Sequence, residues 1–407
     1  MELNGYLQLM VERQASDMFF SPGAPPNIKI EGLVRHVGAK PLTASQVAGM
    51  AASIMNERQQ KDFEDTWEMN LSLSLNDVGR FRVNVYRQRG DVAMAVRYVT
   101  NNIPSIEQLN MPPILKDLIM LPRGLILCVG AAGSGKSTTL ASMIDYRNQE
   151  RTGHILTIEE PIEYIHSHKR SVVDQREVGF DTKTYANALK NAMREAPDVI
   201  MIGEIRDAST MQQAIAYAET GHLCLSTLHA NNANQTLDRI INFFPETART
   251  QVLLDMSLNL KAVISQRLLP SIDPNAKRVP AVEILLSSPY VSDMIIKGEI
   301  SAIKESMKNS TEIGMQTFDE ALFRLFAAGK ITYQSAIEAA DSRTDLSLRI
   351  RLQGLAPQSA IADEMQMEGE PTHGQAQEKV PEKVQEKTDE HLHDAIRKPD
   401  AKPDIVI

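Results

Sequence analysis

One short stretch constrains this chain more than any other, because it joins a buried strand, a glycine-rich loop and the start of a helix. Residues 125–129 are apolar, and the run is short enough for a buried strand. The next residues read Gly130-Ala-Ala-Gly-Ser-Gly-Lys136-Ser137, which matches the pattern Gly-x-x-x-x-Gly-Lys-Ser at every fixed position. A helix beginning near Ser137 aims its positive end at the same loop. The stretch therefore predicts a P-loop that holds the phosphates of a nucleotide.

The residues of this loop have separate mechanical tasks. Its glycines allow a tight turn whose amides point inward at phosphate oxygens. Lys136 can reach the β- and γ-phosphates, and the Ser137 hydroxyl can ligate Mg²⁺. The predicted nucleotide-binding residues of the loop are Gly130, Ala131, Ala132, Gly133, Ser134, Gly135, Lys136, Ser137 and Thr138.

Two polar side chains follow apolar runs further along the chain. Glu204 is the first acid after residues 199–202, where an NTPase keeps a second Mg²⁺ ligand or a residue that directs water. Glutamate is suited to orient or deprotonate the attacking water, so we expect that role for Glu204. His229 follows the run that begins at residue 222. A lone histidine is more often structural, but this one is placed to sense a γ-phosphate, and both interpretations stay open.

Three carboxylates follow another apolar run, residues 155–158. They are Glu159, Glu160 and Glu163. Open α/β sheets bind ligands at the carboxyl ends of their strands, so these acids are expected beside the P-loop. One of them could hold Mg²⁺ through water, since this ion keeps several waters and needs only one or two carboxylates. Spacing leaves open which one does so.

Composition sets outer limits on the function. The chain has 407 residues, 43% hydrophobic and 23% charged, which is ordinary for a soluble globular protein of two or three domains. The net charge is −9, and from Gln358 onward acids outnumber bases by 12 to 6. No basic excess indicates nucleic-acid binding. Cys128 and Cys224 both lie in apolar runs and are expected as buried packing residues, not as a disulfide or a metal site. Neither a signal pattern nor a membrane-spanning run is present, so we expect a cytoplasmic protein without direct membrane insertion.

Secondary-structure patterns divide the chain before and after the P-loop region. Residues 1–104 predict a small α/β domain, with one helix over 43–64 and three antiparallel strands after it. From residue 123 to about 286, strands alternate with helices, which predicts a mostly parallel sheet covered on both faces. Within that region, residues 253–268 are predicted as a helix. Short amphipathic helices follow Pro289, and the polar composition from about residue 357 predicts a disordered tail.

The first domain also carries a face rich in arginine. Its predicted strands present Arg80, Arg82, Arg87, Arg89 and Arg97 on the side opposite their apolar residues. Such a run is usually a solvated face. Arginine also presents a fixed fork of donors that suits phosphate, so a second interpretation is that some of these residues reach a nucleotide. Both interpretations stay open.

Taken together, these motifs resemble those of the secretion-type ATPases of type IV pili. The resemblance rests on the P-loop as Walker A, Ile-Glu-Glu-Pro-Ile-Glu as the Asp box, Ile-Gly-Glu-Ile-Arg-Asp as Walker B, and Gly-His followed by Thr-Leu-His-Ala as the His box. It also includes Gln-Arg-Glu-Val-Gly at 175–179 and Gly-Arg-Phe-Arg-Val-Asn at 79–84, and covers about residues 1–340. The chain is most similar to the retraction branch, the PilT/PilU family.

The resemblance implies a fold, a domain plan and a set of site residues. The fold class is α/β, with a RecA-like P-loop ATPase core, a smaller N-terminal PAS-like α+β domain, C-terminal helices and a disordered tail. The expected boundaries are an N-terminal domain over 1–103, a linker over 104–122, an ATPase core over 123–288, a helical region over 289–356 and an acidic tail over 357–407. ATP and Mg²⁺ are the expected cofactors. The expected catalytic residues are Glu204, Lys136, Glu163 and His229, with Ser137, Glu160 and Glu163 at the metal and Arg82 and Arg97 at the nucleotide.

Family resemblance also implies partners and a mode of action. It predicts a homo-hexamer with ATP between subunits, which powers pilus retraction and twitching motility at an inner-membrane platform protein of the PilC type. Residues 290–297 lack the Ala-Ile-Arg-Asn-Leu-Ile-Arg-Glu motif of PilT chains, and Glu160 stands where the family commonly has Asp. These departures and the acidic tail favour the accessory PilU type, working with a PilT-type ATPase and held peripherally at the inner membrane through the pilus machinery.

Other functions remain as alternatives. The chain could be an autonomous retraction motor of the PilT type, or a weakly active ATP-binding ring that acts by docking. A nucleic-acid translocase is disfavoured by the near-neutral body and by the lack of aromatic residues interleaved with basic ones. A small-molecule kinase is disfavoured because no segment resembles an acceptor-binding lid.

Overall fold

The computed structural model describes residues 2–75, 78–274 and 276–355, so the predicted disordered tail lies outside the described residues. The described chain contains two sheets, one of six strands and one of seven. None of its helices is both long enough and apolar enough to cross a lipid bilayer.

The first sheet is antiparallel throughout and has the strand order β3-β2-β1-β6-β5-β4. The three predicted strands are present as β4 to β6, and three further strands from the start of the chain, β1 to β3, extend the same sheet. Along β5, Phe81, Val83 and Val85 are buried, and Arg80 and Arg82 occupy the alternate positions. This alternation is the expected result of the two-residue period of a strand. The strands are β1 (Asp17–Phe20), β2 (Asn27–Ile30), β3 (Leu33–His36), β4 (Glu68–Leu75), β5 (Gly79–Gln88) and β6 (Asp91–Val99).

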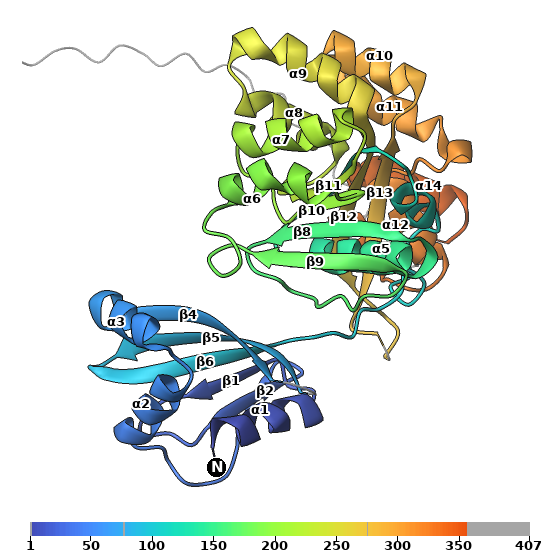
Figure 1. The fold of residues 1–407 in the computed structure, drawn as a ribbon. Helices are drawn as coiled ribbons and strands as arrows, with labels where there is room; N and C mark the ends of the chain where they lie inside the picture. The colour runs from blue at the N-terminus through green and yellow to red at the C-terminus, as the bar shows by residue number, and fades with distance from the viewer. Residues whose placement is uncertain (1, 76–77, 275, 356–407) are drawn as a thin grey trace, which may run out of the picture. The chain divides into compact units, whose positions relative to one another are not determined.

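Three helices complete this region (Figure 1): α1 (Leu3–Glu12), α2 (Ala44–Ser53) and α3 (Glu57–Thr66). The single helix predicted over residues 43–64 is wrong, because the chain forms two helices there. A capping box at Asn56 starts the second helix: the amide of Gln59 donates to Asn56 Oδ1 at 2.9 Å, and the amide of Asn56 donates to Gln59 Oε1 at 3.0 Å.

The second sheet carries the P-loop and has the order β13-β12-β7-β11-β10-β8-β9. All its pairings are parallel except that of β12 with β13, which confirms the predicted mostly parallel sheet. Every residue of the central strands β7 and β11 is buried, as expected when helices cover both faces. The strands are β7 (Gly124–Val129), β8 (Gly153–Glu159), β9 (Ser171–Glu177), β10 (Val199–Ile202), β11 (Leu223–Leu228), β12 (Leu260–Pro270) and β13 (Arg278–Leu286).

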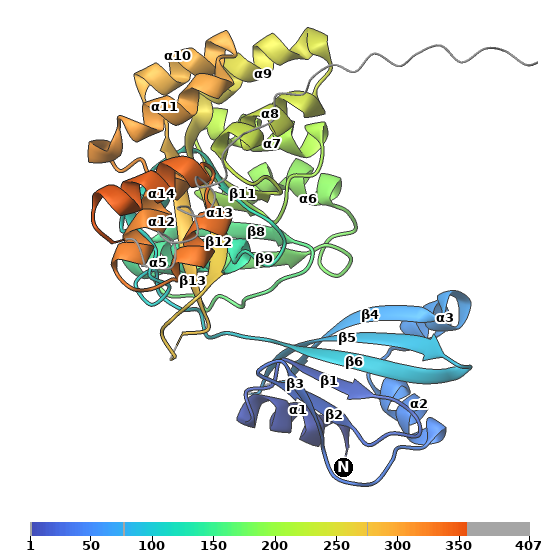
Figure 2. The same cartoon turned by 180° about the vertical axis from the view of Figure 1, so that it is seen from behind.

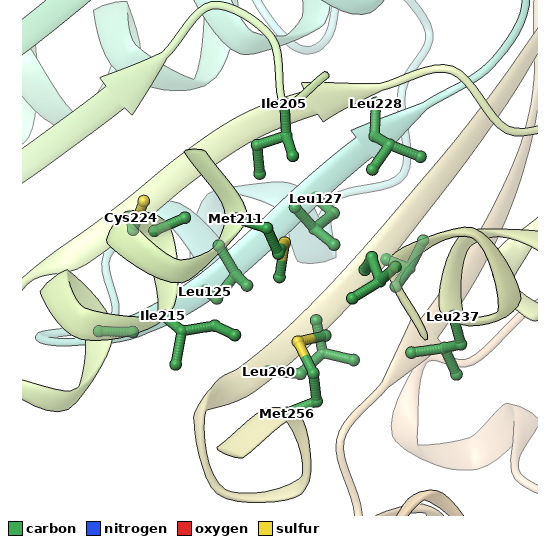
Figure 3. Packing of buried hydrophobic residues seen from close by; sticks show 14 of the residues in the cluster. Leu125, Leu127, Ile205, Met211, Ile215, Cys224, Leu228, Leu237, Met256 and Leu260 are labelled. Carbon is green, nitrogen blue, oxygen red and sulfur yellow. The ribbon is translucent and has the colours of Figure 1, made fainter. Parts of the chain in front are cut away.

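Helices pack on both faces of this sheet (Figure 1). Figure 3 shows one face, where Met211 and Ile215 of α7 pack near Leu125 and Leu127 of β7. Leu237 of α8 belongs to the same apolar cluster. The other face is covered by α4 and α5, which form a second apolar cluster. The helices are α4 (Ile114–Ile119), α5 (Lys136–Glu150), α6 (Tyr185–Ala192), α7 (Ala208–Glu219), α8 (Ala233–Phe243) and α9 (Glu246–Asn259), with the short 3₁₀ helix η1 (Met193–Glu195) after α6.

One predicted element in this region is wrong. The sequence pattern predicts a helix over residues 253–268, but α9 ends at Asn259 and β12 begins at Leu260. The β-branched residues Val263 and Ile264 are fully buried there, and β12 pairs with β7 on one side and with β13 on the other. The pairing with two strands therefore overrides the helical period of the sequence.

The chain after β13 is helical, as predicted. In Figure 2, α12, α13 and α14 gather beside β12 and β13. Their core joins Phe318, Leu322 and Ile350 to Leu269 and Val279 of the two strands. The helices are α10 (Pro289–Lys297), α11 (Ile303–Lys308), α12 (Phe318–Ala327), α13 (Tyr333–Ala339) and α14 (Arg343–Leu352), with the 3₁₀ helices η2 (Ile300–Ala302) and η3 (Thr311–Ile313).

Candidate active site

The glycine-rich loop joins β7 to α5 and has the backbone that its sequence predicts. Gly130, Gly133 and Gly135 all have positive φ angles, of 153°, 74° and 91°. A Cβ atom at Gly130 would lie 2.4 Å from Ser134 Oγ and 2.5 Å from the carbonyl oxygen of Gln266. Glycine is therefore required at this position for both the backbone angle and the space.

Lys136 opens α5 and is 8% exposed. Its Nζ donates to the carbonyl oxygens of Gly130 at 2.9 Å and Ala131 at 3.0 Å, and burial lowers the pKa of this ammonium group. Ser134 Oγ is buried and has no hydrogen-bond partner among the described residues. The loop thus holds a cation and an unpartnered hydroxyl, both of which fit phosphate oxygens.

A cavity above the loop brings together residues from four strand ends. Lys136 and Ser137 come from the loop, Glu163 follows β8, Glu204 follows β10 and His229 follows β11. The strands are parallel neighbours, so their carboxyl ends meet at one edge of the sheet. The cavity is lined by Ala132, Gly133, Lys136, Ser137, Leu140, Ala141, Glu159, Glu160, Pro161, Glu163, Tyr164, His166, Tyr185, Met201, Gly203, Glu204, Thr227 and His229.

Glu204 is held by two nitrogen groups. His229 Nε2 lies 3.2 Å from Glu204 Oε1, and Arg206 Nε donates to Glu204 Oε2 at 3.0 Å. Arg206 also donates to Glu160 Oε2 at 3.2 Å. One arginine therefore joins the carboxylates at the ends of β8 and β10. Sequence reasoning missed Arg206, although its place two residues after Glu204 could have indicated it.

Glu159 differs from the other acids because it is buried. Thr157 Oγ1 donates to its Oε1 at 2.7 Å, and Gln175 Nε2 donates to the same oxygen at 3.2 Å. Burial raises the pKa of Glu159 to about 7. This carboxyl group lines the cavity, yet its partners and its burial suit a structural role better than metal binding.

The segment after β8 is fixed by further hydrogen bonds. Gln175 Nε2 donates to the carbonyl oxygen of Tyr164 at 2.9 Å, and the amide of His166 donates to Gln175 Oε1 at 2.8 Å. The hydroxyl groups of Tyr164 and Thr138 lie 2.8 Å apart. These contacts tie the segment that carries Glu163 to both β9 and the P-loop helix. The sequence placed Gln175 in a motif of the family resemblance but gave it no role in the site.

The donor set of the cavity fits Mg²⁺. Ser137, Glu160 and Glu163 line one cavity and supply only oxygen atoms, which this ion prefers. Among the described residues, no group of three or more His, Cys, Asp or Glu side chains is arranged to hold a metal ion. Mg²⁺ usually takes only one or two carboxylates from a protein, together with substrate phosphates and water.

The two predicted nucleotide-binding arginines lie elsewhere, on the first sheet. Arg82 of β5 and Arg97 of β6 are register partners and line a second cavity together with Asp17. Arg97 Nε donates to Asp17 Oδ1 at 2.8 Å. Burial lowers the pKa of Arg82. Within one subunit, these arginines belong to a different cavity from the P-loop.

The fold and this cavity define the class of P-loop nucleotide hydrolases, with a nucleotide-binding loop and a carboxylate on the neighbouring strand ends. Residues 3–323 match the family model described as type II/IV secretion system protein. The chain is 52% identical over 352 residues to the type IV pilus ATPase PilU of Pseudomonas aeruginosa, which covers 86% of this chain and 92% of PilU.

Two further comparisons agree. The PilT retraction ATPase of the same organism is 39% identical over 340 residues, covering 84% of this chain and 98% of PilT. The crystal structure of the pilus retraction motor PilT with bound ADP matches with a TM-score of 0.79 at 40% identity, covering 85% of this chain and 98% of that one. The chain belongs to the type II/IV secretion system protein family, within the group of type IV pilus ATPases that includes PilU and PilT. The predicted family and fold class are confirmed.

Proposed function

We propose that this chain is an ATP-hydrolysing motor for type IV pilus retraction and twitching motility, of the PilU accessory type. The observation that carries the proposal is the single cavity that combines Lys136, Glu163, Glu204 and His229. The higher identity to PilU, 52% against 39% for PilT, supports the accessory type. So does α10, whose sequence lacks the family motif of PilT chains.

The cavity suggests how its residues share the reaction. Lys136 turns from its two carbonyl partners to the β- and γ-phosphates of ATP. Glu204 accepts the proton of the attacking water or orients it, and Glu163 faces the same space. His229, in contact with Glu204, registers whether a γ-phosphate is present. Mg²⁺, when bound through Ser137 and a carboxylate of Glu160 or Glu163, neutralises charge on the phosphate oxygens.

The motor works as an assembly. We propose a homo-hexamer in which Arg82 and Arg97 of one subunit reach the nucleotide held by its neighbour as the domains close. An arginine supplied in this way stabilises transition-state charge. The ring is cytoplasmic and peripheral at the inner membrane, held by a platform protein of the PilC type and by a PilT-type ATPase.

Purified protein and cells test this function together. ATP hydrolysis is measured on the size-separated hexamer with and without a PilT-type ATPase, and pilus retraction is measured in cells that have either or both proteins. We expect hydrolysis by the chain itself, and retraction only when the PilT-type partner is present. Retraction by this chain alone would assign the autonomous motor instead. If the chain binds ATP but does not hydrolyse it, with or without the PilT-type ATPase, the motor function is rejected. The chain would then be an ATP-binding ring that acts by docking.

A further inference from the structure

A partly buried charged cluster lies between β12 and the C-terminal helices, outside the cavity described above. Arg267 of β12 donates to Asp341 Oδ1 at 2.7 Å and to the carbonyl oxygen of Ala339, and its guanidinium lies 3.8 Å from the centre of the Phe318 ring. Lys304 of α11 donates to Asp341 Oδ2 at 2.8 Å. The side chain of Asp341 is only 10% exposed. Arg267 therefore binds several C-terminal segments at once.

The same cluster reaches the loop that carries His229. The terminal nitrogen of Arg267 that donates to Asp341, Nη2, also lies 3.5 Å from the carbonyl oxygen of Asn231, two residues after His229. Glu283 of β13 is 2% exposed, and it accepts from the amide of Ala233 at 2.8 Å and from Ser265 Oγ at 3.1 Å. Charged side chains of β12 and β13 thus hold the backbone of this loop on both sides of Asn232.

The residue before Arg267 faces the P-loop. Gln266 Oε1 accepts from Thr139 Oγ1 of α5 at 2.7 Å. Successive side chains of a strand point to opposite faces. The end of β12 therefore contacts the P-loop helix through Gln266 and the C-terminal helices through Arg267.

We infer that Arg267 is a positioning residue that links the C-terminal helices to His229 and thereby sets the rate of hydrolysis. The inference rests on the proposed function, in which His229 and Glu204 serve ATP turnover. A planar guanidinium can bind Asp341, Ala339 and Asn231 at the same time, whereas an ammonium group cannot reproduce this fork. Movement of α11 or of the segment at Asp341 is therefore transmitted to the loop of His229.

The test compares two arginine-to-lysine variants in the full-length hexamer. Arg349 of α14 is the matched control, because it pairs with Glu320 and lies 4.2 Å from the ring of Phe323, but within the C-terminal helices. We expect Arg267→Lys to lower kcat about tenfold at unchanged KM for ATP, as couplings between contacting residues typically allow. Arg349→Lys is expected to keep wild-type kcat, and the two variants to show similar Tm values.

Asp341→Asn is the second variant, since it keeps the size of the side chain and removes its charge. We expect the same fall in kcat as for Arg267→Lys. A wild-type kcat in either variant, or an equal fall in Arg349→Lys, would overturn the inference. The proposed function fails separately, if the wild-type hexamer itself does not hydrolyse ATP.

Discussion

Several reactive side chains of the cavity are partnered with one another or with the backbone. Lys136 is bound to two carbonyl oxygens of its own loop, and Glu204 is bound to His229 and Arg206. Binding of nucleotide must therefore exchange these partners for phosphate and water. Substituting Lys136 or Glu204 therefore removes a charged group that acts on the nucleotide or the attacking water, with little loss of core packing.

Lys136→Ala should weaken nucleotide binding strongly. The ammonium group is the buried cation of the P-loop, and loss of one member of such a charged contact typically weakens binding by about a hundredfold. Fluorescence anisotropy with a labelled ATP analogue measures the Kd. Lys297→Ala, at an exposed pair with Asp293, is the control and should bind as the wild type does. Equal affinity in Lys136→Ala would remove this lysine from the site.

Glu159 should make stability depend on pH. Burial raises its pKa from 4.5 to about 7, so the folded protein favours the protonated form. The stabilisation is fully present below about pH 4.5 and is lost as the pH rises through about 7. We expect the Tm of the wild type to fall by about 5 °C more between pH 5 and 8 than that of Glu159→Gln.

The matched control for this pH dependence is Glu246→Gln, at an exposed position in α9. The Tm of this variant should change with pH as much as the Tm of the wild type does. Burial likewise raises the pKa of Glu283 to about 7, so the Tm of Glu159→Gln should still fall somewhat as the pH rises. An identical fall of Tm with pH in the wild type and in Glu159→Gln would contradict a contribution of Glu159 to the pH dependence of stability.

Among the helices, strands and loops, the sequence predicted those elements whose conformation depends on residues close together in the chain. Short motifs predicted the P-loop and the polar residues at the strand ends, and Glu204 and His229 line the same cavity as Lys136. The helical periodicity in the sequence predicted the wrong element at β12, because pairing with β7 and β13 determines the conformation of that segment. Arg267 was missed for the same reason, since it acts through Ala339 and Asp341, more than 70 residues away in the sequence. The contact of Arg206 with Glu160 is also distant in the sequence, although its contact with Glu204 is local.

Gly130→Ala tests the loop as an element. The added Cβ meets Ser134 Oγ and a backbone oxygen at about 2.5 Å, and the backbone φ of 153° disfavours alanine. We expect loss of nucleotide binding and a destabilisation of about 1–3 kcal/mol. Gly49→Ala in α2, where nothing lies within 4 Å, should instead stabilise by about 0.5–1 kcal/mol. Calorimetry measures the stability of the two variants, and the anisotropy assay measures their affinity for the labelled ATP analogue. A Gly130→Ala protein that binds the analogue with wild-type affinity would contradict the loop geometry.

At the scale of the whole molecule, the two arginines of the first sheet distinguish a subunit that works alone from a ring. Arg82 and Arg97 line a cavity other than that of the P-loop, and we propose that the nucleotide they reach is held by a neighbouring subunit. This arrangement would make hydrolysis depend on assembly.

Mixing two inactive variants tests that dependence. Arg82→Ala retains the P-loop, and Lys136→Ala retains the arginine, so mixed rings contain some complete sites. We expect each variant alone to hydrolyse ATP at least tenfold more slowly than the wild type, and the mixture to recover a measurable fraction of the rate. A mixture that is no more active than the sum of its parts would assign Arg82 to a role within its own subunit.

The most direct test of the central claim is single-turnover ATP hydrolysis by Glu204→Gln. The substitution keeps the size of the side chain but removes the carboxylate that contacts His229 and lines the cavity. We expect Glu204→Gln to bind ATP with wild-type affinity and to slow the hydrolysis step by about 100- to 10,000-fold, whereas Glu246→Gln should hydrolyse ATP at the wild-type rate. Hydrolysis by Glu204→Gln at the wild-type rate would contradict it.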